Sequence, residues 1–187
     1  TFYVTLTKAT NAMLSTAYRS TITITDNDTT PIVLDMDNDG VQTISSNSGV
    51  LFDLDADGTK EQIGWVESGD ALLVRDINLD GLISDGSELF GSATTMTTGE
   101  RATDGYEALK SFDDNKDARI DNTDAIFNEL KLWRDTDSDG SVDAGEMVTL
   151  TDAGVTAMSL SATITEQTDN GNTIAISTTF ATLSAGE

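Results

Sequence analysis

Apolar and polar residues alternate over short stretches in most of the chain, a pattern that predicts β-strands. These stretches fall in residues 1–28, 31–90 and 155–180. Residues 104–150 differ, because their apolar residues recur three or four positions apart. That spacing predicts helices. The pattern therefore favours an α+β fold, with short strands on either side of a helical part.

Three helices are expected in the helical part. Thr103 or Asp104 can cap the first and Asn122 or Thr123 the second, because their side chains accept hydrogen bonds from free N–H groups at a helix start. A third, shorter helix is expected after Glu146. The apolar residues of the first two helices are Tyr106, Leu109, Phe112, Ile126, Phe127, Leu130 and Trp133.

The composition excludes several classes of function. The 187 residues include 33 acidic and 10 basic side chains, no His and no Cys, for a formal net charge of −23. Without His or Cys we expect no usual zinc site, no His-activated nucleophile and no disulfide. So acidic a surface would repel nucleic acid and anionic membranes. No apolar run approaches the ~20 residues that span a bilayer, so membrane insertion is not expected. The first residues lack the regions of a signal peptide, so any secretion signal is expected elsewhere.

Most acidic residues lie in five segments that carry an oxygen-bearing side chain at every second position. These loops and the residues that follow them hold 21 of the 33 acids. The spacing suits a hard divalent cation, which needs roughly six to eight oxygens. Positions 1, 3 and 5 supply side chains, position 7 a carbonyl and position 12 an acid, while Gly at position 6 allows the turn. The loops begin at Asp35, Asp53, Asp76, Asp113 and Asp135.

The five loops differ in how well they match this pattern. The last, from Asp135 to Glu146, fits the EF-hand pattern in full. In the fourth, Ala118 replaces the Gly and Asp124 is the closing acid, as in dockerin-like loops. In the third, the closing acid is Glu88, at position 13 instead of 12.

The first two loops have no acid at position 12, where Ser46 and Gly64 stand. Glu61, at position 9, could serve the second loop. Their ions would otherwise need oxygens from elsewhere in the fold, from water or from a ligand. The predicted ligands, loop by loop, are Asp35, Asp37, Asp39 and Val41; Asp53, Asp55, Asp57, Thr59 and Glu61; Asp76, Asn78, Asp80, Leu82, Asp85 and Glu88; Asp113, Asn115, Asp117, Arg119 and Asp124; and Asp135, Asp137, Asp139, Ser141 and Glu146.

Two interpretations of such segments compete: polar turns with solvated carboxylates, or cation sites. Five segments, three of them apolar at position 8, favour cation sites, because clustered carboxylates would otherwise repel one another. Calcium is favoured over magnesium, since carboxylate-rich loops suit the larger and more flexible ion. We expect about five calcium ions, and we expect the last two loops to flank a shared helix as a paired EF-hand-like, dockerin-like unit.

The tryptophans and two arginines have other expected roles. Trp65 and Trp133 lie among apolar residues and are expected in the core. Arg75 and Arg134 each precede the first Asp of a loop and are expected to pair with nearby acids. Trp65 and Arg75 are also the candidate contacts for a ligand.

An ordered series of motifs resembles the calcium-dependent self-processing module of RTX proteins and the related peptide-binding domains of RTX adhesins. It covers roughly four fifths of the chain, which divides on this basis into residues 1–30 and a domain of residues 31–187. Residues 1–28 are similar to the last strands of a Calx-β domain. The motifs are Pro31–Gly40, Leu51–Asp53, Gly64–Val66, Leu72–Asn78, Gly86–Gly91, Gly105–Leu109 and Leu132–Asp135.

The resemblance implies a reaction that this chain is not expected to perform. In the family, calcium triggers cleavage of an Asp-Pro bond at the start of the module, by attack of the Asp carboxylate on its own carbonyl. Here Thr30 precedes Pro31 and Thr29 precedes Thr30, so that carboxylate is missing. A Thr hydroxyl would have no His to act as its base. We therefore expect no enzyme activity.

The resemblance also implies a biological setting. It predicts a calcium-dependent module of a large secreted RTX adhesin on the surface of a Gram-negative bacterium, with a role in cell adhesion and biofilms. The expected partner is a peptide or a protein C-terminus on another cell surface, bound by a monomeric module within a multidomain chain. A passive, calcium-rigidified unit of an adhesin stalk is the alternative, and a self-cleaving module is a third, less favoured possibility.

Overall fold

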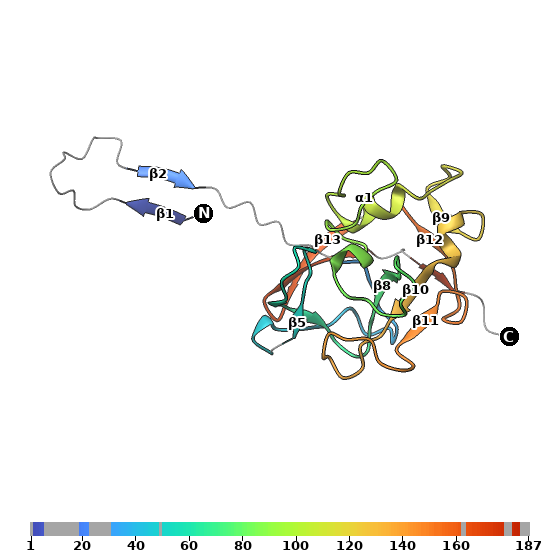
Figure 1. Cartoon of the computed structure of the whole chain (residues 1–187), viewed down its shortest axis with the longest axis horizontal. Helices are drawn as coiled ribbons and strands as arrows, with labels where there is room; N and C mark the ends of the chain where they lie inside the picture. Colours follow the sequence, from blue (N-terminus) through green and yellow to red (C-terminus); the bar gives the residue numbers. More distant parts are fainter. Residues whose placement is uncertain are drawn as a thin grey trace.

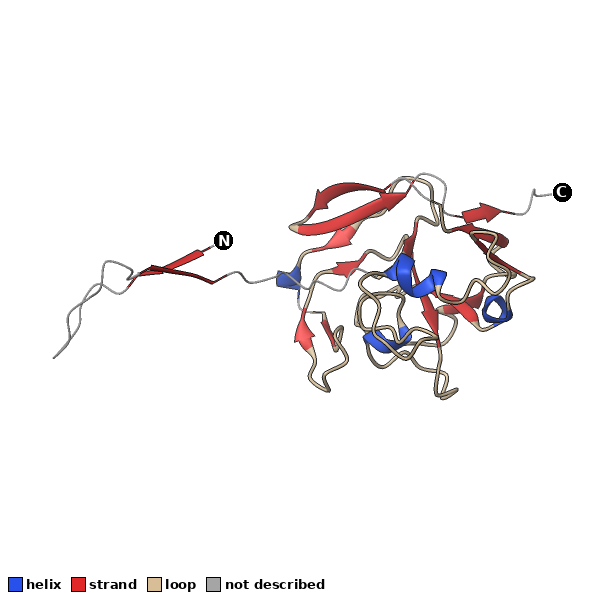
Figure 2. Ribbon diagram, turned by 90° about the horizontal axis from the view of Figure 1, so that it is seen from above, coloured by secondary structure: helices blue, strands red, loops and turns tan. Residues whose placement is uncertain are grey.

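The structure is a computed structural model of the whole chain, and it describes residues 2–5, 19–22, 31–48, 50–161, 164–177 and 181–183. Most of this chain is loop, interrupted by short strands (Figure 2). Within the described ranges, no helix is both long and apolar enough to cross a membrane.

A four-stranded antiparallel sheet organises the fold, with the strand order β11-β10-β8-β3. Side chains alternate between its two faces, as the pleat of a strand requires. In β8, Ala71 and Leu73 lie in one core and Leu72 and Val74 in the other. The sheet is therefore covered on both faces, which explains the continuous apolar sequence of β8. The strands are β3 (Val33–Leu34), β8 (Ala71–Arg75), β10 (Leu130–Trp133) and β11 (Met147–Thr149).

The other strands form smaller sheets (Figure 1). A three-stranded antiparallel sheet has the order β15-β12-β9, and the other strands form two-stranded pairs. The strands of the three-stranded sheet are β9 (Arg119–Asp121), β12 (Val155–Ser159) and β15 (Ala181–Leu183). The pairs are β1 (Phe2–Thr5) with β2 (Arg19–Ile22), β4 (Thr43–Ile44) with β7 (Trp65–Val66), β5 (Leu51–Phe52) with β6 (Glu61–Gln62), and β13 (Ile164–Asp169) with β14 (Asn172–Ser177).

The helical content of the described residues is small. Asp104 caps the α-helix by accepting a hydrogen bond from the N–H of Glu107 at 2.8 Å, as the sequence predicted. The helical elements are α1 (Gly105–Lys110) and three single 3₁₀ turns, η1 (Ser46–Ser48), η2 (Gly86–Glu88) and η3 (Ala125–Asn128).

The predicted α+β fold with a paired EF-hand-like helical part is wrong, because the regular secondary structure of the described residues is mainly β-strand, in small antiparallel sheets. The expected second helix is the 3₁₀ turn η3 followed by strand β10, and the expected third helix is strand β11. In β10, Leu130 and Leu132 enter one core and Trp133 the other, so the apolar spacing reflects a strand buried on both faces. The loop at Asp135 joins two antiparallel strands instead of two helices.

The N-terminal segment carries the hairpin β1–β2. The division of the chain at residue 30 remains a prediction. Thr29 and Thr30, on which the predicted loss of cleavage depends, lie outside the described residues.

Candidate metal centres

The five acidic loops share one hydrogen bond that closes the start of each loop. The N–H of the residue at position 6 donates to the carboxylate at position 1, at 2.9–3.0 Å in every loop. This bond ties the start of each loop to its turn, and the carboxylates of Asp53, Asp76 and Asp135 are also buried. The pairs are Gly40 with Asp35, Gly58 with Asp53, Gly81 with Asp76, Ala118 with Asp113 and Gly140 with Asp135.

The loops also share a backbone conformation. In each, the residues at positions 4 and 6 have positive φ, which turns the chain tightly around the side chains at positions 1, 3 and 5. At position 6, Gly adopts positive φ at little energetic cost in four loops, whereas Ala118 adopts φ 64° although it has a β-carbon. The position-4 residues are Asn38, Ala56, Leu79, Lys116 and Ser138, with φ between 55° and 67°. The position-7 residues Val41, Thr59, Leu82, Arg119 and Ser141 follow directly.

Three of the loops are closed by a carboxylate that bridges their two arms. The carboxylate of Glu146 accepts hydrogen bonds from the N–H groups of Thr136 at 2.7 Å and Asp143 at 2.9 Å, positions 2 and 9. Asp124 bridges Asp114 and Asp121 in the same way, at 2.9 and 3.0 Å.

Glu88 also bridges positions 2 and 9 of its loop, although it stands at position 13. Its carboxylate accepts from Ile77 at 3.1 Å and Ser84 at 2.9 Å. The 3₁₀ turn η2 brings Glu88 to this position, and the carboxylate of Asp85 caps that turn by accepting from the N–H of Ser87 at 2.8 Å. Glu88, Asp124 and Glu146 are all buried.

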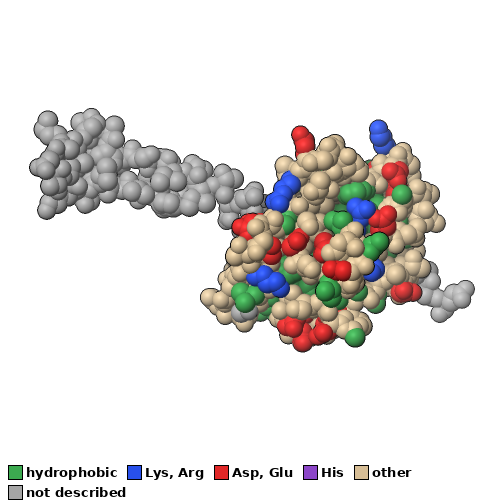
Figure 3. All heavy atoms as spheres, viewed as in Figure 1, with side chains coloured by type: hydrophobic (Ala, Val, Ile, Leu, Met, Phe, Trp, Pro, Cys, Tyr) green, Lys and Arg blue, Asp and Glu red, His purple; other side chains and the backbone are tan. Residues whose placement is uncertain are grey.

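The loop at Asp135 brings the largest number of acids together. The carboxylates of Asp135, Asp137 and Glu146 lie within 4.8 Å of one another, as do those of Asp137, Asp139 and Asp143. Burial raises the pKa of Asp135, although hydrogen bonds from Gly140 and Trp65 act in the opposite direction. Acidic side chains also form a group at the lower edge of the face shown in Figure 3.

The pKa of Glu146 is shifted in the opposite direction from that of Asp135. Its burial raises the pKa of the carboxyl group, but hydrogen bonds from the N–H groups of Asp143 and Thr136 and from the Thr136 and Trp133 side chains together leave the pKa below its ordinary value. Glu146 is therefore held as a carboxylate that faces the acids of its own loop.

The first two loops also gather acids that lie close enough to hold a metal ion. Asp35, Asp37 and Asp39 form one such group, and Asp53, Asp55 and Asp57 the other, each with oxygens within 4.8 Å. The pKa of Asp39 is raised, first by the hydrogen bond that it shares with Asp37 and then by burial.

Glu61, the predicted ligand at position 9 of the second loop, lies near the acids of that loop. Its pKa is raised by burial and then by the charges of Asp57, Asp55 and Asp53. The guanidinium of Arg101 donates to the carbonyl of Asp55 at 2.9 Å. Among the described residues, no carboxylate bridges the arms of this loop as Glu146 does in the last.

The third and fourth loops carry Asn at position 3, so each has two carboxylates instead of three at positions 1, 3 and 5. Asn78 accepts from the N–H of Asp80 at 2.9 Å, and Asn115 from that of Asp117 at 2.9 Å, which orients both amides within their loops. All five donor sets consist of oxygens, the ligands that hard cations such as Ca²⁺ take, so the residues fit such an ion.

The two predicted ligand contacts have internal partners. Trp65 is 4% exposed in the second core, and its indole N–H donates to Asp135 at 2.7 Å. Arg75 pairs with Glu129 at 2.7 Å and lies over the ring of Phe112, 5.4 Å from its centroid. Arg75 thus has a nearby acid as its partner, as expected.

Trp133 is also in the core, as the sequence predicted, and is fully buried. Arg134 differs from the expectation of an acidic partner, since its guanidinium donates to the carbonyl of Gly69 at 2.8 Å. This bond joins the start of the last loop to the segment that precedes β8.

One acid near the loops was missed by the sequence interpretation. Asp70, directly before β8, is 1% exposed, and its carboxylate accepts from the N–H groups of Met36 at 3.2 Å and Gln42 at 2.9 Å, on the two arms of the first loop. It lies outside the repeated acidic pattern, and only its place between Gly69 and a strongly apolar strand distinguishes it in the sequence.

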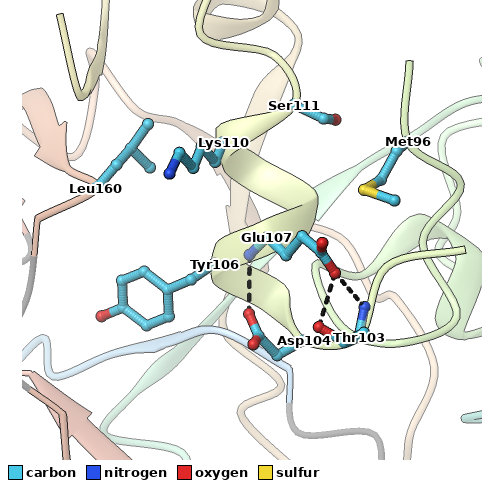
Figure 4. Close-up of a pocket in the computed structure, with 8 residues that line it drawn as sticks. All are labelled: Met96, Thr103, Asp104, Tyr106, Glu107, Lys110, Ser111 and Leu160. Carbon is cyan, nitrogen blue, oxygen red and sulfur yellow. Dashed lines mark hydrogen bonds between the residues drawn. The ribbon is translucent and has the colours of Figure 1, made fainter. Parts of the chain in front are cut away.

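A shallow hollow of about 580 Å³ lies beside α1 (Figure 4). Lys110 and Leu160 face one another across part of it, with Tyr106 below. Glu107 accepts from the hydroxyl and the N–H of Thr103, both at 2.7 Å, and these bonds lower its pKa. The hollow is open, and the two acids that line it, Asp104 and Glu107, are not among the predicted metal ligands.

Residues 32–186 match the SPM domain model, and the chain belongs to this family. The chain is also similar to the iron-regulated protein FrpA of Neisseria meningitidis serogroup C, with 40% identity over 148 residues. This match covers 78% of the chain but 13% of that protein, so the chain spans a small part of its relative's length.

Proposed function

We propose that this chain is a calcium-dependent binding module of a large secreted RTX adhesin, and that it does not cleave itself. The main support for calcium binding is the geometry that the five loops share. In each, the N–H of the position-6 residue fixes the first carboxylate, inside a turn with two residues of positive φ. Membership of the SPM domain family and the likeness to FrpA, a much longer protein, support the placement in a large chain.

Calcium explains why so acidic a chain forms a compact structure. The clusters place three carboxylates within 4.8 Å, which in water would oppose folding by mutual repulsion. Bound cations turn this repulsion into attraction, so metal binding and folding are coupled. Such irregular sites are expected to fill outside the cell, where calcium is abundant, and not in the cytosol.

Calorimetry and native mass spectrometry of the purified chain test this part of the proposal. We expect about five ions per chain, with release of all of them by EGTA and a large loss of stability. Magnesium at the same concentration should restore little of that stability. A stoichiometry of zero, or equal stability in calcium and EGTA, would contradict the proposal.

The ligand is proposed to be a peptide or protein that presents a free C-terminal carboxylate, bound at the second loop. This loop has acids at positions 1, 3, 5 and 9, but no bridging carboxylate among the described residues, so its ion would keep a coordination position open. The guanidinium of Arg101 lies against the same loop and adds positive charge. A carboxylate from another chain would complete the coordination.

A peptide library with free and amidated C-termini tests the ligand, measured in calcium and in EGTA. Free C-termini should bind in calcium only, and Arg101→Ala should weaken binding more than Lys116→Ala, a matched change in another loop. Equal binding of free and amidated peptides would contradict the proposal. Absence of all peptide binding would instead favour a passive structural unit of a stalk.

Self-cleavage has a separate test. The purified chain in calcium should stay intact on a gel, because Thr30 offers no carboxylate to attack its own carbonyl. A fragment that begins at Pro31 would show that this interpretation is wrong. Thr30→Asp is the matched variant: cleavage gained by it would show that a single residue accounts for the loss.

A further inference from the structure

Asp70 lies beside the first loop because of the pairing of β3 with β8. Leu34 is opposite Ala71 in the antiparallel register, so the residues that follow β3 and precede β8 meet at the same end of the sheet. The carboxylate of Asp70 accepts from the N–H of Met36 at 3.2 Å and of Gln42 at 2.9 Å. These are positions 2 and 8 of the loop that begins at Asp35.

A similar pair of hydrogen bonds to one carboxylate closes three other loops of the same chain. Glu88, Asp124 and Glu146 each bridge positions 2 and 9 of their loops with one carboxylate. Asp70 bridges positions 2 and 8 from a separate segment of the chain. Ser46, at position 12 of the first loop, is exposed in the turn η1 and carries no carboxylate.

Burial of Asp70 independently points to a cation. The residue is 1% exposed, and among the described residues no Lys or Arg forms an ion pair with it. Each of its oxygens accepts one hydrogen bond, although a carboxylate oxygen has two acceptor positions. A buried carboxylate beside other acids is costly unless a positive charge compensates it.

We propose that Asp70 is the closing ligand of the first loop, in a calcium site built from two separate segments with Asp35, Asp37 and Asp39. This inference rests on the proposed function. The ion would tie the segment after β3 to the start of β8, while Asp76, directly after β8, belongs to the third loop. The central strand would then be held at both ends by calcium ligands.

Asp70→Asn tests the inference by native mass spectrometry and calorimetry on the full chain. The substitution removes the charge and keeps the size. We expect one calcium ion fewer, or an affinity at one site at least tenfold lower. Asp152→Asn is the matched control. It makes the same charge change at an exposed residue whose carboxylate accepts a hydrogen bond from the Thr149 hydroxyl, and it should keep every ion. Ser46→Ala should also keep every ion.

A double variant assigns the lost ion to the first loop. Asp35→Asn should lose one ion, and Asp35→Asn with Asp70→Asn should lose the same single ion, because both residues serve one site. Loss of two ions by the double variant, or normal binding by Asp70→Asn, would overturn the inference while leaving the proposed function intact. Absence of calcium binding by the unaltered chain would overturn both. If Asp70→Asn does not fold, Asp70→Glu keeps the charge and should still weaken one site at least tenfold; normal affinity would overturn the inference.

Discussion

The indole N–H of Trp65 donates to the carboxylate of Asp135 at 2.7 Å, and both residues are buried. Trp133 makes a similar but longer bond to Glu146, at 3.3 Å, and the two indoles lie 5.5 Å apart, edge to face. The first and last acids of the fifth loop are thus both bonded to aromatic residues of the second core. A change in the position of these two carboxylates would therefore alter the packing of the second core.

Replacement of Trp65 by Phe should show the strength of this coupling. Trp65→Phe removes the donor to Asp135 and should lower the free energy of unfolding by about 1.5–3 kcal/mol, the usual range for a hydrogen bond to a charged group. Urea unfolding in saturating calcium measures the change. Trp133→Phe removes the same ring volume but a longer bond, so it should cost less. Equal losses would show that packing alone matters.

The fourth loop should gain stability from a glycine. Ala118 has φ 64°, where a β-carbon is unfavourable. Ala118→Gly should stabilise the calcium-bound chain by about 0.5–1 kcal/mol and raise the affinity of that loop for calcium. The reason is that relief of backbone strain in the folded state outweighs the greater conformational freedom of Gly in the unfolded state. Ala108→Gly, in α1, is the control and should destabilise the chain. Thermal unfolding of both variants in calcium distinguishes the signs.

Two glycines with close neighbours should respond differently to alanine. A β-carbon on Gly86 would lie 1.8 Å from the carbonyl oxygen of Leu54, whereas one on Gly64 would lie 1.9 Å from the side chain of Asn172. Gly86→Ala should cost about 3 kcal/mol or more, since the backbone must move. Gly64→Ala should cost about 1–2 kcal/mol, because Asn172 can rotate away and lose its hydrogen bonds. Urea unfolding of the pair would contradict this account if Gly64→Ala were the worse.

The contact between Asp169 and Thr43 should make stability depend on pH. Hydrogen bonds from the Thr43 hydroxyl and N–H, both at 2.8 Å, lower the pKa of Asp169. A carboxyl group with a lowered folded pKa stabilises the protein above its unfolded pKa of about 3.9, and loses that effect as the pH falls through the folded value.

Asp169→Asn should therefore be less stable than the unaltered chain near pH 6, and the difference should shrink below about pH 4. Urea unfolding of both chains across this range measures it, and the titration of the acidic loops cancels in the difference. Thr43→Val, which removes the hydroxyl donor, should reduce the same pH dependence. A difference that does not change with pH would contradict the assigned cause.

Much of the local structure was predictable because it depends on residues close in the sequence. The acidic pattern located all five loops, and the Gly at position 6 of four of them indicated the tight turn, where the structure has positive φ. The start of α1 was predictable from Asp104, whose side chain caps the helix locally. The strands β5, β7 and β8 likewise fall within stretches predicted to be strands.

The region after Thr123 was not predictable in the same way, because its structure depends on partners far away in the sequence. Leu132 pairs with Leu73, and Trp133 with Leu72, so the segment is extended although its apolar spacing also fits a helix. A strand buried on both faces has no alternation that would distinguish it from a buried helix.

The sequence by itself determined where acidic oxygens that could hold a metal ion gather, since a loop of alternating acids must bring its own side chains together. The same spacing indicated the closing acids Glu88, Asp124 and Glu146. The tertiary structure alone decided which distant residues reach the loops: Asp70 lies beside the first loop through the register of β3 with β8, and Trp65 reaches Asp135 through core packing. Contacts between distant segments depend on how strands pair and pack, which no local spacing encodes.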